Sequence, residues 1–376
     1  MADAGHAAGG TDGIKLLRTR VVLGHETVQN VSSTAYPGAY PGVDDSFSIE
    51  SFAKGFKVDV ISETDDVIEF DMIGADAAVA NTVRRILIAE VPTMAIENCF
   101  IYNNTSIIQD EVLAHRLGLV PIKADPRKFE FSKGTDDRDE TNYIVFRLQV
   151  KCEKRKDAPA DATSHDELYV NHRVLSGDLV WVPQGNQLEE FGEGGIRPVH
   201  DDILLAVLRP GQEVDIELHC VKGIGKEHAK WSPVCTASYR LHPEIVLLKE
   251  FEGDEADRLA ACFGAGVIEV TKDGAGRRVA RVNNPRACTM SREVHRHPDL
   301  APHVRLQRIR DHFIFSVEST GALKAAELVS EAIACMVDKA ELMLNTLSRL
   351  ETEVDEDDAM PADNKDAMVA EPDGNL

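Results

Sequence analysis

The sequence predicts a fold that mixes short strands with a few helices and carries a strand-rich insertion. Three observations support this prediction: two neighbouring segments with alternating apolar and polar residues, a loop-rich central region with short strand patterns, and a long C-terminal helix with a seven-residue apolar repeat. With 376 residues, the chain is long enough for two domains, or for one domain with a large insertion.

The first 50 residues are predicted to form an extended N-terminal arm rather than a domain. Residues 36–42 read YPGAYPG, and such a repeat of Pro and Gly favours extended chain over a regular element. A strand pair follows, because Phe56–Ile61 and Val67–Met72 alternate apolar and polar side chains on either side of the acidic turn Ser62–Asp66. We expect these two strands to form a hairpin.

An amphipathic helix is predicted from Ala75 to Glu90, with Pro92 just beyond its end. Its apolar stripe consists of Val79, Val83, Ile86 and Leu87. Arg84 and Arg85 lie off this stripe. The pair suits either a solvated helix face or bidentate contacts to the carboxylates of a neighbouring protein, and the pattern leaves both interpretations open.

Residues 99–235 are interpreted as an inserted, mostly-β domain. A helix is expected over Ile107–Leu117, ending at Gly118. The other expected elements are short strands between turn-rich loops: Ile144–Val150, Leu179–Val182 and Val214–Cys220.

The segment Gly223–Trp231 has two glycines followed by a lysine, which resembles a phosphate-binding loop. Phosphate binding is not expected, because such a loop continues with a Ser or Thr that ligates magnesium, and Glu227 stands at that position. Basic residues beside an aromatic one are typical instead of a protein-binding loop. The candidate contact residues are Lys222, Lys226, His228, Lys230 and Trp231.

A strand over Phe313–Glu318 precedes a helix predicted to span Leu323–Leu350, which would be about 42 Å long. Its apolar residues are spaced alternately by four and three, as in a coiled-coil seam. Either this seam packs on the chain's own sheet, or it docks on a partner's helix, which the small Ala340 would allow to approach closely. The seam consists of Val329, Ile333, Met336, Ala340, Met343, Leu347 and Leu350.

The charge of the chain restricts its class of function. Lys and Arg number 41 and Asp and Glu 64, so the net charge is −23, and direct binding to a phosphate backbone is not expected. Residues 351–376 contain ten acidic residues and one basic one, which predicts a disordered acidic tail. The chain has no apolar run of about 18 residues and no signal-peptide core in Met1–Gly13, so we expect it in the cytosol or nucleus.

No catalytic, cofactor or metal site is expected. The seven cysteines are scattered without a CxxC motif, which favours buried thiols over structural zinc. His200, Asp201 and Asp202 could belong to a metal-dependent hydrolase, the alternative from a different functional class. No HExxH or G-x-S-x-G motif accompanies them or the second cluster, His295–His297 with His303, so solvated loops or capping roles are favoured.

Several motifs resemble one known family. Residues 81–97, NTVRRILIAEVPTMAIE, are similar to the signature helix of the alpha-like subunits of RNA polymerases, a family that includes bacterial alpha, its archaeal counterpart and the third subunit of RNA polymerase II. Four further blocks extend the likeness: Tyr102–Ile122, Arg197–Cys220, Val221–Val234 and Ile314–Ile333. The segments Leu168–Gln187 and Val21–Gly38 resemble the larger alpha-like subunit shared by eukaryotic RNA polymerases I and III.

The resemblance implies an α+β fold with a discontinuous dimerisation domain, residues 51–98 and 236–350, and an inserted domain, residues 99–235. It also bears on metals, since the polymerase II relative carries a zinc-binding cysteine cluster in this insertion. Here, apart from Cys99 at its first position, only Cys152, Cys220 and Cys235 lie across it, so no cofactor is expected and the subunit of polymerases I and III is favoured. The third subunit of polymerase II remains the alternative.

The resemblance further implies a non-catalytic assembly subunit, located in the nucleus and nucleolus. Its C-terminal helix would pair with the smaller alpha-like subunit. Arg84, Arg85 and the loop Lys222–Trp231 would face the largest and second-largest subunits of polymerases I and III. The complexes would synthesise ribosomal RNA precursors and small RNAs such as 5S rRNA and tRNA, and this chain would meet nucleic acid only indirectly.

Overall fold

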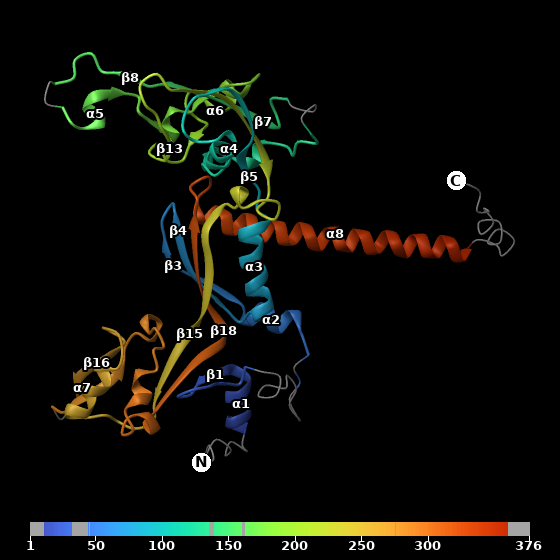
Figure 1. Ribbon diagram of the computed structural model, residues 1–376. Coiled ribbons are helices and arrows are strands. Elements are labelled where there is room, and N and C mark those ends of the chain that lie inside the picture. The colour runs from blue at the N-terminus through green and yellow to red at the C-terminus, as the bar shows by residue number, and fades with distance from the viewer. Residues whose placement is uncertain are drawn as a thin grey trace, which may run out of the picture.

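The computed structural model of the chain describes residues 11–31, 44, 46–134, 139–159, 162–274 and 276–359 (Figure 1). Helices and antiparallel strands build an α+β fold, as predicted. Three separate apolar cores lie in a central unit, an inserted unit and a third, smaller unit. None of the helices in these residues is long and apolar enough to cross a membrane.

The central unit is built on a six-stranded antiparallel sheet in the order β2-β1-β18-β4-β3, with β15 paired to β18. Phe70 of β4 stacks on Phe315 of β18 with ring centroids 4.9 Å apart, and Ile86 and Leu87 of α3 pack in the same core. The predicted hairpin and helix are therefore confirmed. The elements are α1 Thr11–Thr19, β1 Arg20–Leu23, β2 Val28–Gln29, α2 Ile49–Gly55, β3 Lys57–Glu63, β4 Val67–Ile73, α3 Ala77–Ala89, β15 Val234–Leu247, β18 Val304–Ser319 and α8 Ala325–Ala359.

The inserted unit is mostly β, and its sheet has the order β11-β7-β14-β5. Leu113 and Leu117 of α4 are fully buried against this sheet, because they lie four residues apart on one helix face. Its elements are β5 Thr93–Asn104, α4 Asp110–Gly118, β6 Ile122–Lys123, β7 Tyr143–Lys151, β8 Glu153–Lys154, α5 His165–Leu168, β9 Tyr169–Val170, β10 Arg173–Leu175, β11 Val180–Val182, α6 Gln187–Phe191, β12 Arg197–Pro198, β13 Leu204–Val207 and β14 Glu213–Gly223.

The third unit was not predicted. It consists of α7 (Gly253–Ala261), β16 (Ile268–Lys272), β17 (Arg278–Val282) and connecting loops, at the lower left of Figure 1. Its core includes Phe251 and Leu259 together with residues of β1 and β18. This unit and the central unit therefore share strands of one sheet.

A bulge in β18 marks the joint between these two units. The register between β15 and β18 changes from Leu241 opposite Phe313 to Pro243 opposite Arg308. Residues 309–312 of β18 thus lie opposite a single residue of β15. The other neighbour of β18 changes at the same place, from β4 to β1.

The N-terminal arm differs from the prediction. Residues 11–19 are helical, and β1 joins the sheet beside β18, where Arg20 Nε lies 2.6 Å from Glu244 Oε2. The prediction of an extended arm failed here because a four-residue strand whose partner lies far along the chain has no distinctive local pattern. The YPG repeat at 36–42 lies outside the described residues.

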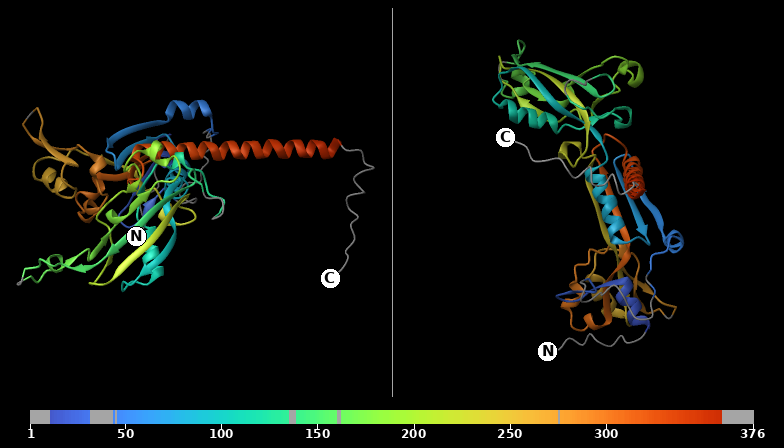
Figure 2. Two further views of the ribbon diagram at one scale, coloured as in Figure 1. Left: turned by 90° about the horizontal axis from the view of Figure 1, so that it is seen from above. Right: turned by 90° about the vertical axis from the view of Figure 1, so that its right-hand side faces the viewer.

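Helix α8 starts two residues later than predicted and continues nine residues further, to Ala359. At 35 residues it is about 52 Å long. Figures 1 and 2 show that it starts on the central unit and then projects away from the body. The first nine residues of the predicted disordered tail, 351–359, are thus helical, and residues 360–376 lie outside the described residues.

Candidate protein interfaces

The first half of α8 packs on the chain's own core. Leu328 is completely buried there, and the seam residues Val329 and Met336 are partly buried against the same core. Lys339 Nζ lies 2.8 and 2.9 Å from the two carboxylate oxygens of Glu90, which ties the helix to the end of α3. For Val329 and Met336, the interpretation that the stripe packs on the chain's own core is confirmed, whereas the seam residue Ile333 is exposed.

The second half of α8 has no such cover. All residues from Ala340 to Leu350 are exposed, with Met343 68% and Leu347 54% accessible. Contiguous apolar surface of this kind marks a site of protein association. The large exposed apolar side chains of α8 are Ile333, Val337, Leu342, Met343, Leu344, Leu347 and Leu350.

The exposed face is wider than the predicted seam. Val337 follows the seam residue Ile333 by four residues, and Leu344 follows Val337 by seven, so Val337 and Leu344 form a second apolar row beside the seam. The heptad pattern does not include this row, because it follows a single line of residues along the helix. The seven-residue spacing of Val337 and Leu344 is the signal that identifies it.

The two basic segments that the sequence singled out lie together. The backbone N–H of Lys226 donates to the carbonyl of Ala89 at the end of α3, at 2.8 Å. A Cβ on Gly225 would lie 2.3 Å from the carbonyl oxygen of Ile88, so only glycine fits this contact. The loop after β14 is therefore seated on the C-terminal end of the helix that carries the arginine pair.

Trp231 and Lys230 hold this loop rather than presenting it to a partner. The ring of Trp231 is buried, and its Nε1 donates to the carbonyl of Val221 at 3.1 Å. Lys230 Nζ donates to the carbonyl of Ile96 at 2.9 Å and pairs with Glu97. The buried ring therefore argues against the prediction that Trp231 contacts another protein, because composition does not distinguish a buried aromatic side chain from an exposed one.

Lys222 is also engaged within the chain. Its Nζ donates to the carbonyl of Phe129 at 2.8 Å, and burial lowers the pKa of Lys222. Lys226 and His228, by contrast, have exposed side chains. Of the five predicted loop residues, these two are accessible to another protein.

In the arginine pair of α3, one side chain is likewise engaged within the chain and the other is accessible. Arg84 donates from Nε and Nη2 to Asn81 Oδ1 at 3.1 and 2.9 Å. Arg85 is exposed, and within the described part of the chain no hydrogen bond or ion pair engages its side chain. The accessible basic surface thus consists of Arg85, Lys226 and the neighbouring His228.

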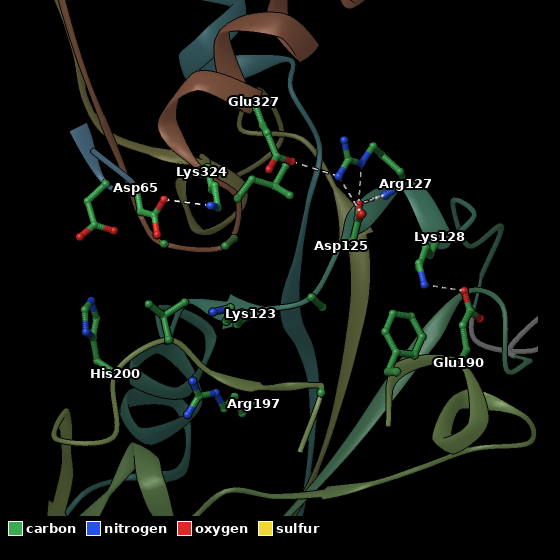
Figure 3. A pocket seen from close by; sticks show the side chains of 18 residues that line it. Asp65, Lys123, Asp125, Arg127, Lys128, Glu190, Arg197, His200, Lys324 and Glu327 are labelled. Carbon is green, nitrogen blue, oxygen red and sulfur yellow. Dashed lines mark hydrogen bonds and ion pairs between the residues drawn. The ribbon is translucent and has the colours of Figure 1, made fainter. Parts of the chain in front are cut away.

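A pocket of about 650 Å³ lies where the inserted unit meets the start of α8 (Figure 3). Arg127 crosses this joint: its Nη2 lies 2.8 Å from Asp125 Oδ2 and 3.1 Å from Glu327 Oε2, and its Nη1 lies 3.3 Å from Glu331 Oε1. A further pair, Lys324 with Asp65, lies beside it. The pairs of Arg127 with Glu327 and Glu331 attach the inserted unit to the base of α8, whereas the pair of Lys324 with Asp65 lies within the central unit.

The hydrolase alternative finds no support at this pocket. His200 lines it, but on the side away from Asp125 and Arg127 in Figure 3. The carbonyl of His200 accepts a hydrogen bond from Ser176 Oγ and that of Asp201 one from the Gly177 N–H, which are structural loop contacts. Across the described ranges, no three His, Cys, Asp or Glu side chains are arranged to hold a metal ion.

Six of the seven thiols are buried or partly buried, with Cys99 and Cys335 in the partly buried group. Burial raises the pKa of Cys99 to about 11 and also raises the pKa of the fully buried Cys220. Cys152, Cys262 and Cys288 are buried as well. Cys235 is exposed, contrary to the expectation that the cysteines are buried.

The sequence is similar to that of known RNA polymerase subunits. The family model for the RNA polymerase Rpb3/Rpb11 dimerisation domain matches residues 69–340. The mouse DNA-directed RNA polymerases I and III subunit RPAC1 is 56% identical over 339 residues, covering 90% of this chain and 98% of the mouse protein.

Two relatives from Dictyostelium discoideum allow a comparison within one organism. The polymerases I and III subunit rpac1 is 46% identical over 337 residues, 89% of this chain and 94% of that protein. The polymerase II subunit rpb3 is 33% identical over 301 residues, 77% of this chain and 93% of that protein. The chain belongs to the family of RNA polymerase subunits that carry the Rpb3/Rpb11 dimerisation domain.

Proposed function

We propose that this chain is the larger alpha-like subunit shared by RNA polymerases I and III, a non-catalytic subunit on which the complex assembles. The observation that carries the proposal is the exposed apolar second half of α8, on a chain 56% identical to a subunit of polymerases I and III. A helix that leaves its own domain with an apolar face needs a second protein to cover it.

The partner for this face is the smaller alpha-like subunit. A matching helix would pack against Met343, Leu347 and Leu350, with Ala340 allowing close approach. The second apolar row, Val337 and Leu344, provides width for more than one helix of the partner. Association through such a surface is driven mainly by burial of apolar area.

The largest and second-largest subunits are proposed to dock on the basic surface of Arg85, Lys226 and His228. These side chains are exposed, and the loop that carries two of them is seated firmly on α3. Fixed cationic groups favour contact with carboxylates of a neighbouring protein. In a chain of net charge −23, this small surface is suited to protein rather than to nucleic acid.

The comparison within Dictyostelium favours polymerases I and III over polymerase II. The chain is 46% identical to the polymerases I and III subunit and 33% identical to the polymerase II subunit. Membership of these complexes places the chain in the nucleus, and the role in synthesis of ribosomal RNA precursors places part of it in the nucleolus.

Affinity purification of the tagged full-length chain from its own cells, with identification of the bound subunits, tests the proposal. We expect the smaller alpha-like subunit together with the largest subunits of both polymerase I and polymerase III. Recovery of the polymerase II largest subunit instead would support the alternative assignment. Recovery of no polymerase subunit would reject both assignments.

A further inference from the structure

A group of arginine side chains lies beside the bulge of β18. Three arginines come together there: Arg240 of β15, Arg286 of the short 3-10 helix Pro285–Ala287, and Arg308 of β18. Arg286 is neutralised, because it pairs with Asp71 and its Nη2 lies 3.7 Å from Glu69 Oε2. Asp71 Oδ2 also lies 2.9 Å from His312 Nε2, so both carboxylates already have partners, and their charges act on Arg240 only from beyond ion-pair distance.

The next carboxylate along β15 is committed as well. Glu244 accepts from Arg20 Nε at 2.6 Å and also from the side-chain amide of Gln307. Within the described ranges, Arg240 and Arg308 form no ion pair with any carboxylate. Neither of these two arginines therefore has a carboxylate within ion-pair distance in the described part of the chain.

The hydrogen bonding and burial of these two side chains also favour binding of an anion. Arg240 Nη2 donates to the carbonyl of Arg286 at 2.8 Å, and Arg308 Nε is buried with no hydrogen-bond acceptor in the part of the chain that the structure describes. Burial, followed by the charges of Arg286 and Arg308, lowers the pKa of Arg240. A buried donor without an acceptor is costly, so an incoming anion would stabilise this site.

Both arginines line one cavity of about 280 Å³. The apolar residues Leu241, Pro243 and Met290 complete much of its wall. Met290 has a left-handed backbone, with φ of 58°, which is unusual for an unbranched residue other than glycine or asparagine. Such strained conformations cluster at ligand-binding sites.

We propose that Arg240 and Arg308 bind the carboxylate of an Asp or Glu side chain from a second polypeptide. Two guanidinium groups match a carboxylate through paired hydrogen bonds, and the apolar wall suits the methylene groups that carry it. The cavity holds one side chain rather than a strand of nucleic acid, which the overall charge of −23 also disfavours. The site lies apart from α8 and from the basic surface on α3, so it is a separate contact.

Carbodiimide cross-linking tests this proposal, because the reagent joins an amine to a carboxylate only when the two are in contact. The variant Arg308→Lys, in the tagged full-length chain, places an amine in the cavity and keeps its charge. The complex that the chain enters is cross-linked, and the linked peptides are identified by mass spectrometry. We expect an amide bond between position 308 and an Asp or Glu of another polypeptide. Arg281→Lys, at an exposed position of β17 outside the cavity, is the matched control.

Three results would overturn the proposal: no link at position 308 while other lysines of the complex react, links only to carboxylates of this chain, or the same link from position 281. A thermal midpoint raised by inorganic phosphate in the wild-type complex, and not in the double variant Arg240→Gln with Arg308→Gln, would identify a free anion and overturn the polypeptide source. Subunit recovery is measured on the same samples, so failure of the proposed polymerase assignment is scored separately.

Discussion

The two halves of α8 have similar sequence character and different surroundings. Leu328, in the first half, is completely buried, whereas Leu347, in the second, is 54% exposed. Both lie on the apolar side of one continuous helix. The first half stabilises the chain itself, and we propose that the second half stabilises only a complex. The heptad pattern alone cannot separate these roles, because it does not show where the supporting sheet ends.

The largest effect is expected from placing charge in the second half. In the double variant Met343→Asp with Leu347→Asp, two carboxylates would be buried without partners in the dimer interface, at a cost of several kcal/mol. We expect the smaller alpha-like subunit to be lost on co-purification, while the thermal midpoint of the free chain stays unchanged. A heterodimer recovered at normal yield would disprove the seam assignment.

Truncation of a buried side chain in the first half should destabilise the free chain itself. Leu328→Ala creates a cavity in the central core and should lower the free energy of unfolding by about 2–5 kcal/mol, measured by urea denaturation of the isolated chain. Leu347→Ala is the matched control and should change it by less than about 0.5 kcal/mol. Equal losses from the two variants would mean that the second half is packed within the free chain.

Charge reversal on α3 tests whether the basic surface acts independently of α8. The double variant Arg85→Glu with Lys226→Glu should weaken binding of the large subunits by roughly tenfold and leave the heterodimer intact. Recovery of each subunit by quantitative mass spectrometry is the measurement. Arg18→Glu, in the last turn of α1, provides a reversal at a different site. Unchanged recovery in the double variant would show that Arg85 and Lys226 are only solvated.

The smallest effect concerns pH and lies away from both halves of α8. Burial lowers the pKa of His242, so its neutral form is favoured in the folded chain and stability is lost as pH falls below about 6.5. For Asp71, burial acts to raise the pKa, but hydrogen bonds from Arg286 and His312 outweigh it and lower the pKa. Its contribution is therefore lost at lower pH, below about 3.9.

The thermal midpoint should fall in two steps as the pH is lowered, the first from His242 and the second from Asp71. The variant His242→Gln should remove the first step only. A curve that stays flat between pH 7 and pH 5 would contradict the assignment to His242. Because α8 is not involved, Leu347→Ala should show the same pH dependence as the wild type.

Much of the central unit could be predicted, because its strands and helices have strong local periodicity. The strand pair before α3, α3 itself and α8 all show this. The third unit was missed because β16 and β17 are only five residues each, and their core is completed by residues of β1, β15 and β18 that are distant in the sequence. Within the candidate interface, Arg85 and Lys226 are exposed as expected. Trp231 and Lys230, by contrast, are engaged within the chain. Trp231 contacts β14 and Lys230 contacts β5, and composition does not reveal such contacts.

The central position of β18 has a consequence for how the chain folds during synthesis. This strand pairs with β1, β4 and β15, yet it is made last of the four, after residue 303. The inserted unit, by contrast, is contiguous from β5 to β14 and can form its core while the ribosome is still translating the rest. The early strands β1 and β4 can pair with β2 and β3, but the other edge of each stays unpaired until β18 is made. We expect nascent chains released before residue 304 to contain a protease-resistant inserted unit and an unprotected N-terminal segment.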